Sequence, residues 1–563
     1  MEFLDARRLT GPSLLFDGPA AILDVAATAS EIDEFVPAWE RAVRRMLTEF
    51  DWPEPEFREH RLSGGVSVAF TVPIDSLYAA SMINEWAYAE VAAAMGEGDA
   101  PDYAEGLAAA REAYADEVNP GLLALEAAAA ERGVSFLWDD DEVSLGLGKY
   151  STTWPVKALP AAAAIDWSGF GDVPIGIVTG TNGKTTTVRL AQHILMDAGR
   201  TVGLSSTDWI AVDNDIIDRG DWSGPGGART VLRQPGIDTA VLEAARGGLL
   251  RRGLGVYKAD AALITNISED HLGDFGSQTV AELLDVKWVI SRAVRDYGRL
   301  ALNADDARLV EKARTYPGEI VWFSTERHDL DGLPGRSVAL FFRRGDELAV
   351  LEDAATTVFA DVREVPLTMQ GIARHNVANA LAAAALTWCL GASLGEIGRG
   401  LASMSQDENP GRCNLYELNG RRVLIDFAHN PAAMQALFTM AESIPAARRV
   451  LCFGQAGDRP DSLIEELTRD AYAIGLERVI VSELAQYHRG REHGDVYRII
   501  RSELLRLGMT ADGIDHHEEE LESLDAALAW AAEGDLVIML ALGASRAVRA
   551  RLVELGARPL ATV

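Results

Sequence analysis

Residues 175–187 read IGIVTGTNGKTTT, an apolar run that leads into a loop rich in glycine and threonine with one lysine. A helical pattern follows, with apolar residues on one face as far as Ala198 and then Gly199 as a helix C-cap. Strand, Gly-Lys-Thr loop and helix form the arrangement that cradles a nucleotide triphosphate, because loop N–H groups and the positive helix end face the phosphates. The stretch therefore predicts an ATP-binding domain.

The loop departs from the standard Walker A pattern, which has a glycine where this chain has Val178. The shorter pattern G-x-x-G-K-T remains, between a predicted strand and a predicted helix. We expect Lys184 to reach the β- and γ-phosphates and the Thr185 hydroxyl to ligate Mg²⁺. The loop residues assigned to ATP are Gly180, Thr181, Asn182, Gly183, Lys184, Thr185 and Thr186.

Composition and charge restrict the class of protein. A chain of 563 residues suggests three or four domains, and 48% hydrophobic with 24% charged residues is typical of globular proteins. The net charge of −33 argues against nucleic acid or an anionic membrane as partner, since both need a basic surface. The sequence shows no signal peptide, no membrane-length apolar run and no metal-like cysteine spacing, which together predict a cytoplasmic protein.

Three α/β domains are expected. Residues 1–165 form a helix-rich, Ala- and Glu-rich region that ends in a looser stretch, 149–165, interpreted as a linker. Residues 166–407 alternate strands and helices, the pattern of a parallel sheet with crossover helices. Residues 408–563 repeat this alternation, which favours a small Rossmann-like domain. Its strands are expected at 423–427, 450–453, 479–481 and 536–540.

Polar side chains stand where two further strands of the middle domain end. Glu243 closes an apolar run, and His271 follows the run 261–264. Because ligands bind at the carboxyl ends of parallel strands, both side chains are expected in the crevice beside the phosphate loop. Each has an ordinary alternative, since a strand-end glutamate is commonly a surface or capping residue and a lone histidine is commonly structural. Lys287, in the helical pattern 280–294, is interpreted from its spacing alone as a solvated lysine.

These signals occur in order along the chain and are followed by further motifs. The further motifs are LNADD at 302–306, GIARHNVANA at 371–380, GR at 411–412 and DFAHNP at 426–431. The ordered set resembles the Mur ligase family, the ATP-dependent amide-forming enzymes that include the peptidoglycan ligases and folylpolyglutamate synthase. The resemblance runs from Val173 to the C-terminus. It implies a P-loop-containing central domain with a parallel sheet and a Rossmann-like C-terminal domain, preceded here by an α+β N-terminal domain.

Other stretches are similar to the Mur-type half of cyanophycin synthetase. They read GDWSGP at 220–225, ARGGLLR at 245–251 and RGR at 489–491. Fainter agreement lies at 59–65 and 145–150, and in that family the second of these opens an ATP-grasp domain. Here it leads at once into the Mur-like domain. The resemblance therefore implies that the ATP-grasp module is missing and that this chain does not polymerise by itself.

The resemblance also implies a mechanism. ATP phosphorylates a carboxylate to an acyl phosphate, and an amine then attacks it. The implied catalytic residues are Lys184, Glu243, His271 and Lys287, and two Mg²⁺ ions are implied, with Thr185, Glu243 and His271 as ligands. Lys287 occupies the position that is carbamylated in several Mur ligases, so a carbamylated lysine is an open expectation.

Four residues of the later motifs are implied to complete the ATP site. Asn376 is expected on the adenine side, and Arg412 at the γ-phosphate. Asp426 and His429 are expected to close over the ribose and phosphates, which would exclude water from the acyl phosphate.

Charged residues outside the ATP motifs are candidates for substrate binding. Arg246 and Arg251 stand out in so acidic a chain, and a guanidinium fork suits a carboxylate. A structural ion pair is the equal alternative for them. Asp458 and Arg459 correspond to the region where Mur ligases bind the incoming amine.

The main interpretation is an ATP-dependent ligase that joins an amine, such as an amino acid, to a small or peptide-like carboxylate. The alternative is a non-polymerising subunit of a two-protein cyanophycin-like pathway, or an ATP-binding regulatory protein, that needs a separate ATP-grasp enzyme. A kinase or simple NTPase would leave the motifs at 411–412 and 426–431 unexplained. A homo-oligomer is compatible with the resemblance.

Overall fold

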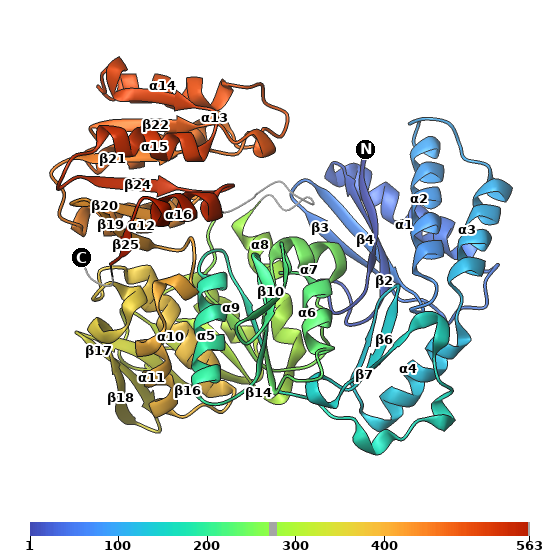
Figure 1. Ribbon diagram of the computed structural model, residues 1–563. Helices are drawn as coiled ribbons and strands as arrows, with labels where there is room; N and C mark the ends of the chain where they lie inside the picture. Colours follow the sequence, from blue (N-terminus) through green and yellow to red (C-terminus); the bar gives the residue numbers. More distant parts are fainter. Residues whose placement is uncertain (270–278, 561–563) are drawn as a thin grey trace. The chain divides into compact units, whose positions relative to one another are not determined.

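The computed structural model describes residues 1–269 and 279–560 (Figure 1). Contacts between residues divide the chain into two compact units. The first unit comprises Met1–Phe323, Leu330–Leu340 and Ala382–Glu396, and the second comprises Ser324–Asp329, Phe341–Leu381 and Ile397–Val563. Each unit is an α/β assembly built around its own parallel strands, which confirms the predicted fold class.

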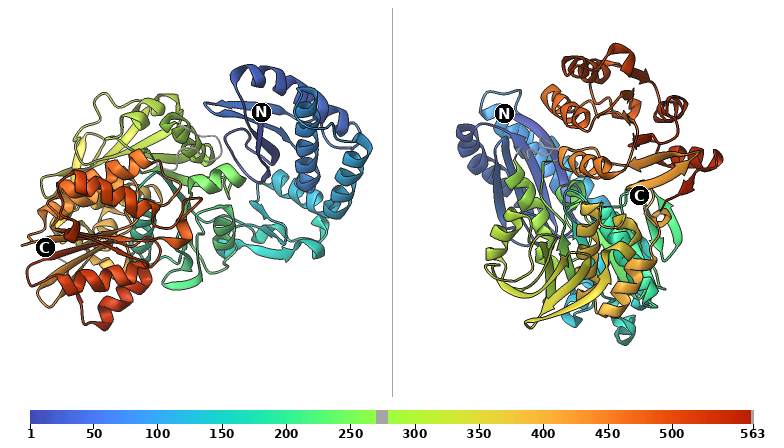
Figure 2. Two further views of the ribbon diagram at one scale, coloured as in Figure 1. Left: turned by 90° about the horizontal axis from the view of Figure 1, so that it is seen from above. Right: turned by 90° about the vertical axis from the view of Figure 1, so that its left-hand side faces the viewer.

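The first unit begins with an antiparallel sheet in the order β1-β2-β4-β3, with α1 and α2 packed against it (Figure 2). The elements are β1 (Glu2–Leu9), β2 (Ala20–Ala26), α1 (Ala29–Leu47), β3 (Phe57–Leu62), β4 (Gly65–Thr71), α2 (Leu77–Ala94), α3 (Tyr103–Glu117) and α4 (Pro120–Arg132). Helix α1 forms because Phe35, Trp39 and Met46 recur at helical spacing on one buried face. The Trp39 indole donates to Asn84 Oδ1 on α2 at 3.0 Å, which satisfies its one polar atom.

The stretch interpreted as a linker is partly a strand. Strand β7 (Thr152–Pro155) pairs antiparallel with β6 (Glu142–Leu145), which pairs with β5 (Phe136–Trp138). The linker interpretation is therefore wrong for these residues. The signal that misled it, a cluster of proline and alanine, here belongs to an edge strand and the short 3-10 turns after it.

The central part of the first unit is a largely parallel sheet that contains the phosphate loop. Its elements are β8 (Ile175–Thr179), α5 (Lys184–Asp197), β9 (Val202–Ser205), β10 (Trp209–Val212), β11 (Asp215–Arg219), α6 (Pro225–Leu232), β12 (Thr239–Glu243), α7 (Arg246–Arg252), β13 (Ala259–Ile264), α8 (Val280–Trp288), β14 (Val294–Asn303), α9 (Ala307–Lys312), β15 (Glu319–Ser324) and β16 (Arg336–Arg344). The order is β11-β10-β9-β12-β8-β13-β14-β15-β16, with β8 parallel to both β12 and β13. Every residue of β8 is buried, as expected for a strand covered on both faces.

A short segment between β1 and β2 forms a backbone junction with the central part of the first unit. Thr10 N donates to Arg252 O at 2.8 Å, and Leu254 N donates to Pro12 O at 2.7 Å. Between them, a Cβ at Gly11 would lie 2.0 Å from Leu254 O, so only glycine fits there. Arg229 of α6 adds a side-chain donor to Thr10 O at 3.0 Å.

The second unit contains a seven-stranded sheet in the order β23-β22-β21-β24-β20-β19-β25. Its elements are β17 (Glu347–Glu352), β18 (Ala355–Asp361), residues 374–381 of α10 (Arg374–Cys389), residues 397–403 of α11 (Leu394–Ser403), β19 (Asn414–Leu418), β20 (Arg421–Asp426), α12 (Pro431–Ser443), β21 (Arg449–Phe453), α13 (Asp461–Ala473), β22 (Arg478–Ser482), α14 (Asp495–Arg506), β23 (Ile514–His517), α15 (Glu520–Trp530), β24 (Leu536–Leu540), α16 (Ser545–Glu554) and β25 (Arg558–Pro559). Strands β20 to β24 are parallel, and buried clusters cover both faces of the sheet. The four strands expected from the sequence are β20, β21, β22 and β24, and they are confirmed.

Among the residues that the structure describes, no helix is long and apolar enough to cross a membrane.

A buried ion pair in the N-terminal sheet gives a stability prediction. Arg7 Nη1 lies 2.5 Å from Asp24 Oδ2, and the side chains are only 7% and 2% exposed. We expect Asp24→Ala to lower the free energy of unfolding of this part of the chain by about 3–5 kcal/mol, because it leaves a buried guanidinium without its nearest counter-ion. Urea denaturation, followed by intrinsic tryptophan fluorescence, measures the change.

Asp5 provides the matched control for this experiment. Its carboxylate also faces Arg7 Nη1, at 3.4 Å, but its side chain is 42% exposed. Asp5→Ala should cost less than about 1 kcal/mol, as for most exposed ion pairs. Equal losses from the two substitutions would contradict the assignment of the Arg7–Asp24 pair as the stabilising one.

Candidate functional site

The phosphate loop is fixed at its first half by the segment that follows β13. Thr181 N donates to Asn266 O at 2.9 Å, and Asn182 N donates to Asn266 Oδ1 at 3.0 Å. The Asn266 amide returns a bond to Asn182 O, also at 3.0 Å. These two loop N–H groups therefore hold the loop in place, and the first turn of α5 is left to present N–H groups to an anion.

Two residues from other elements support the loop where β8 ends. Gly180 has φ +143°, and a Cβ there would lie 1.8 Å from the Thr265 hydroxyl oxygen. Its carbonyl accepts a hydrogen bond from the Lys287 ammonium group at 2.7 Å. Lys287 is 3% exposed, so the interpretation of a solvated helix lysine is wrong. Helical spacing placed the side chain on a face of α8 but did not reveal that this face packs beneath the loop. Whether Lys287 is carbamylated stays a prediction.

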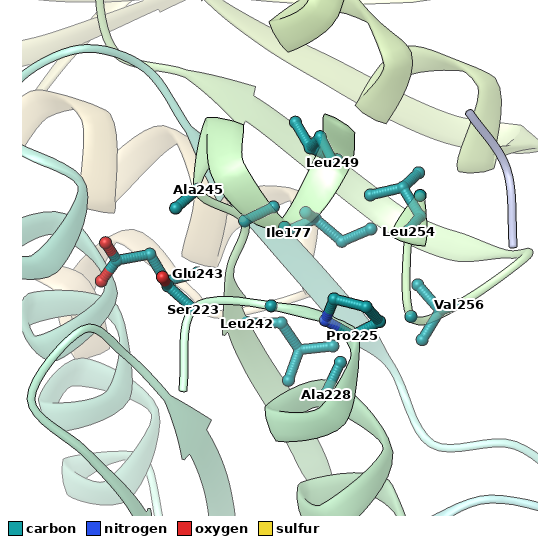
Figure 3. Close-up of a pocket in the computed structure, with 15 residues that line it drawn as sticks. Ile177, Ser223, Pro225, Ala228, Leu242, Glu243, Ala245, Leu249, Leu254 and Val256 are labelled. Carbon is teal, nitrogen blue, oxygen red and sulfur yellow. The ribbon is translucent and has the colours of Figure 1, made fainter. Parts of the chain in front are cut away.

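Oxygen atoms meet beside the first turn of α5. The Thr185 hydroxyl donates to Glu243 Oε2 at 3.1 Å, and Thr207 donates to Glu243 Oε1 at 2.7 Å from its hydroxyl and to Oε2 at 3.3 Å from its N–H. Glu243 is 2% exposed, and Figure 3 shows its carboxylate directed away from Leu242 and Leu249. Thr185 and Glu243 were expected in one crevice, but Thr207 was not predicted to join them. The available signal was a polar Ser-Ser-Thr-Asp run that begins at the last residue of buried β9.

This oxygen set suits a hard cation. Mg²⁺ in nucleotide sites is commonly held by one or two protein oxygens together with phosphates and water, and Thr185 with Glu243 fits that pattern. In the described ranges, no group of three or more His, Cys, Asp or Glu side chains could hold a metal ion. His271, the other expected ligand, lies outside the described residues.

Behind Glu243 is a small apolar cavity of about 20 Å³ between β12, α6 and α7 (Figure 3). Pro225, Leu249 and Leu254 are among its lining residues, and the space is about that of one water molecule. The residues that line it therefore pack around the end of β12 and leave no room for a substrate.

The two predicted substrate arginines lie close to Glu243 along the chain, whereas Lys184 belongs to the phosphate loop. The Lys184 ammonium donates to Thr181 O at 3.0 Å, so the side chain folds back over the loop. Arg246 is the first residue of α7, three residues after Glu243, which ends β12, and it is partly exposed. Arg251 is exposed near the other end of α7. The two guanidinium groups are thus carried by one short helix that begins at the site.

The four predicted ATP residues of the second unit divide into one group and one separate residue. Asp426, at the end of β20, accepts the N–H groups of Cys413 and Ala428, both at 2.7 Å. Burial raises the pKa of the Asp426 carboxyl, and the nearby charges of His375 and Arg412 oppose that rise. A carboxyl poised in this way can respond to a further cation or phosphate nearby.

Aromatic contacts hold the other two members of this group. The Arg412 guanidinium stacks on the Phe427 ring, 4.2 Å from its centroid, and His429 Nδ1 lies 3.1 Å from Phe427 O. Asn376 is separate: it is 2% exposed, its amide donates to Leu367 O at 2.9 Å, and its Oδ1 accepts from Asn379 at 3.1 Å. The structure uses this amide inside the second unit, and its contact with adenine stays a prediction.

The predicted amine region is tied to the RGR motif at 489–491. Asp458 pairs with Arg489 at 2.5 Å, and Arg491 donates to Gly457 O at 2.6 Å and to Arg459 O at 2.5 Å. From the sequence, Arg489 and Arg491 carried part of the family resemblance and were not assigned to a site. Their contacts show that the two loops form one surface.

Two segments of the chain match known domain families. Residues 178–387 match the Mur ligase middle domain, and residues 411–543 match the Mur ligase glutamate ligase domain. A cyanophycin synthetase of Geminocystis herdmanii is 35% identical over 411 residues, which cover 71% of this chain and 46% of the relative. A UDP-N-acetylmuramyl-tripeptide synthetase of Deinococcus radiodurans is 30% identical over 315 residues, 54% of this chain and 60% of the relative. This chain therefore spans less than half the length of the cyanophycin synthetase.

Solved structures agree in fold. E. coli FolC in complex with DHPP and ADP has a TM-score of 0.50 with this chain at 20% identity, covering 68% of this chain and 89% of FolC.

The crowding at Gly180 gives a test of the loop. Gly180→Ala should abolish binding of ATP, because the added methyl group would overlap the Thr265 hydroxyl and the backbone at φ +143° is strained for alanine. A titration with a fluorescent ATP analogue and Mg²⁺ measures the affinity.

Gly236→Ala is the matched control, since a Cβ at Gly236 meets nothing within 4 Å. It should bind the analogue as the unmodified chain does. Undiminished affinity in Gly180→Ala, with both variants folded by circular dichroism, would contradict the role given to the loop.

Proposed function

Because this chain belongs to the Mur ligase family through its middle and C-terminal domains, we propose that it is an ATP-dependent ligase that forms an amide between a carboxylate and an amine. The carboxylate is small or peptide-like, and the amine is that of an amino acid. The observation that carries the proposal is the hydrogen bond from Thr185 to Glu243 beside the first turn of α5. In this proposal the carboxylate and the hydroxyl hold the metal of the nucleotide, and Lys184 neutralises phosphate charge.

The chain's own groups support phosphoryl transfer from ATP to the carboxylate. N–H groups in the first turn of α5 and the Lys184 ammonium bind and orient the phosphates. Thr185 and Glu243 would hold Mg²⁺, which supplies charge neutralisation at the β- and γ-phosphates. We assign the acceptor carboxylate to Arg246, on the helix that starts beside Glu243.

The second half of the reaction is amide formation. The amine attacks the acyl carbon of the acyl phosphate, a tetrahedral intermediate forms, and phosphate leaves with the bond electrons as the amine loses a proton. We assign the amine to the surface made by residues 457–459 and 489–491, where a cationic group of the amine substrate would compete with Arg489 for the Asp458 carboxylate. Asp426, Arg412 and His429 are assigned to ATP from the second unit.

The proposal includes two candidate partners, a second copy of this chain and a separate enzyme. An oligomer and a separate ATP-grasp enzyme that supplies the acceptor are compatible with the kinship to cyanophycin synthetase. A product that forms only when an ATP-grasp enzyme is added to the assay would support the second partner.

The test is phosphate release from Mg·ATP across a panel of aspartyl peptides and free dicarboxylates, crossed with amino acids and polyamines. We expect phosphate with one acid–amine pair, together with a product at the summed mass less water by mass spectrometry. Glu243→Gln should lower kcat by about 10–100-fold, because it removes the charge beside the metal. ADP formation without an amide, unchanged in Glu243→Gln, would contradict the ligase.

The matched control is Glu131→Gln, a glutamate of the same unit whose side chain is 77% exposed. It should leave kcat and KM unchanged. A loss of activity in this variant equal to that in Glu243→Gln would show that the panel reports general damage and not the chemistry at Glu243.

A further inference from the structure

The first unit contains a cavity of about 660 Å³ that shares no lining residue with the phosphate site. It lies between β1, α2, α3 and the last residue of α7. Its polar lining includes Arg8, Tyr78, Glu85, Asp116, Glu117 and Arg252. Ligand sites in proteins occupy roughly 300–1,000 Å³, so the cavity is large enough for a small molecule.

Three arginines converge on one side of this cavity, and two of them have carboxylate partners. Arg7 pairs with Asp24, and Arg8 donates to both oxygens of Asp140, at 2.8 and 3.1 Å. Arg252 donates to the carbonyl of Arg8 at 3.3 Å, and within the described part of the chain it forms no ion pair. Burial, and then the positive charge of Arg8, lower the pKa of Arg252. A carboxylate from a ligand would supply the missing counter-ion.

Acidic groups from α2 and α3 line the same cavity. Glu85 forms no hydrogen bond or ion pair among the residues described, and burial with the neighbouring charge of Asp5 raises its pKa. Glu117 accepts the N–H groups of Tyr78 and Ala79 at 3.0 and 2.8 Å, yet burial still raises its pKa. A cationic group of a ligand would stabilise both carboxylates.

We propose that this cavity is a second ligand site that binds a small zwitterion, an amino acid or a short peptide, with its carboxylate on Arg252 and its cationic group on Glu85 and Glu117. An anion alone would leave Glu85 without a partner, and a cation alone would leave Arg252 without one. Tyr78 and Met82, 47% and 37% exposed, line the same cavity and offer contact to the aliphatic part of the ligand.

The zwitterion has two sources that share this chemistry. It is either a separate molecule or the end of the acceptor substrate that is remote from the reacting carboxyl group. The second source rests on the proposed ligase function. Arg252 ends α7, whose first residue, Arg246, follows Glu243 closely. Seven helical residues span about 10 Å, the length of roughly three extended peptide residues. A peptide acceptor with its reacting carboxyl at Glu243 could therefore reach Arg252.

The test is isothermal titration of the full chain with alanyl-arginine in the absence of ATP. We expect one molecule bound per chain. Removing the carboxylate by using the peptide amide, or the cations by using acetyl-alanyl-glutamine, should weaken binding at least about 10-fold, a loss of roughly 1.4 kcal/mol. Arg252→Gln should weaken it similarly, and Arg252→Lys should weaken it less.

Two further variants separate this site from the catalytic one. Arg111→Gln changes an exposed arginine of α3 that pairs with Glu49 outside the cavity, and it should bind the peptide normally. Lys184→Ala should also bind normally, so failure of the ligase proposal would leave this result intact. If the site holds the acceptor's far end, Arg252→Gln raises KM for the acceptor with kcat unchanged; if the ligand is separate, KM stays the same.

Two outcomes would overturn the proposal. One is the absence of binding by the unmodified chain up to about 10 mM peptide, a concentration at which a complex with a Kd of about 1 mM is readily detected. The other is unchanged affinity in both Arg252→Gln and Glu85→Gln. The two variants come from different elements, so a folding defect in one leaves the other to decide.

Discussion

The hydrogen bond from Lys287 to the Gly180 carbonyl is the contact on which the phosphate site depends. It draws the carbonyl at the end of β8 inward and holds it against a helix that is far along the chain. Asn266 then fixes the next two residues through their N–H groups. With the first half of the loop used in this way, the start of α5 is the part that can face an anion. A buried ammonium group is costly unless it is paired, so the loop and the lysine stabilise each other.

Much of the fold could be predicted because its signals are local. Strand β8 and the four parallel strands of the second unit are short apolar runs between turn signals, and runs of this kind are read correctly from the sequence alone. The N-terminal sheet was harder. Its strand β3 has no buried residue, only exposed and half-buried ones, and alanine-rich helices dominate the composition of this region. Strand β7 was missed for a related reason, since proline and alanine near an edge strand look like a linker.

The candidate site shows the same division between local and distant information. Parallel strands end at one edge, so Glu243 and Thr185 could be expected together, and the structure does bring them together. Thr207 carries no signal of its own, because a threonine after a strand is ordinary. The burial of Lys287 could not be inferred, since spacing along α8 says which residues share a face and not what that face meets. Asn376 illustrates the converse, because its amide has partners within its own unit.

The segment 10–12 has a consequence for how this chain can be rearranged. It forms backbone hydrogen bonds to residues on both sides of Gly253, and β1 sends Arg7 to the Leu250 carbonyl of α7. The N-terminal domain therefore packs against α7, the helix that carries Arg246 and Arg251. A chimera that joins this central domain to a foreign N-terminal domain would lose the bonds that define the end of α7. The two domains are expected to have been inherited as a pair, with substitutions in one compensated in the other.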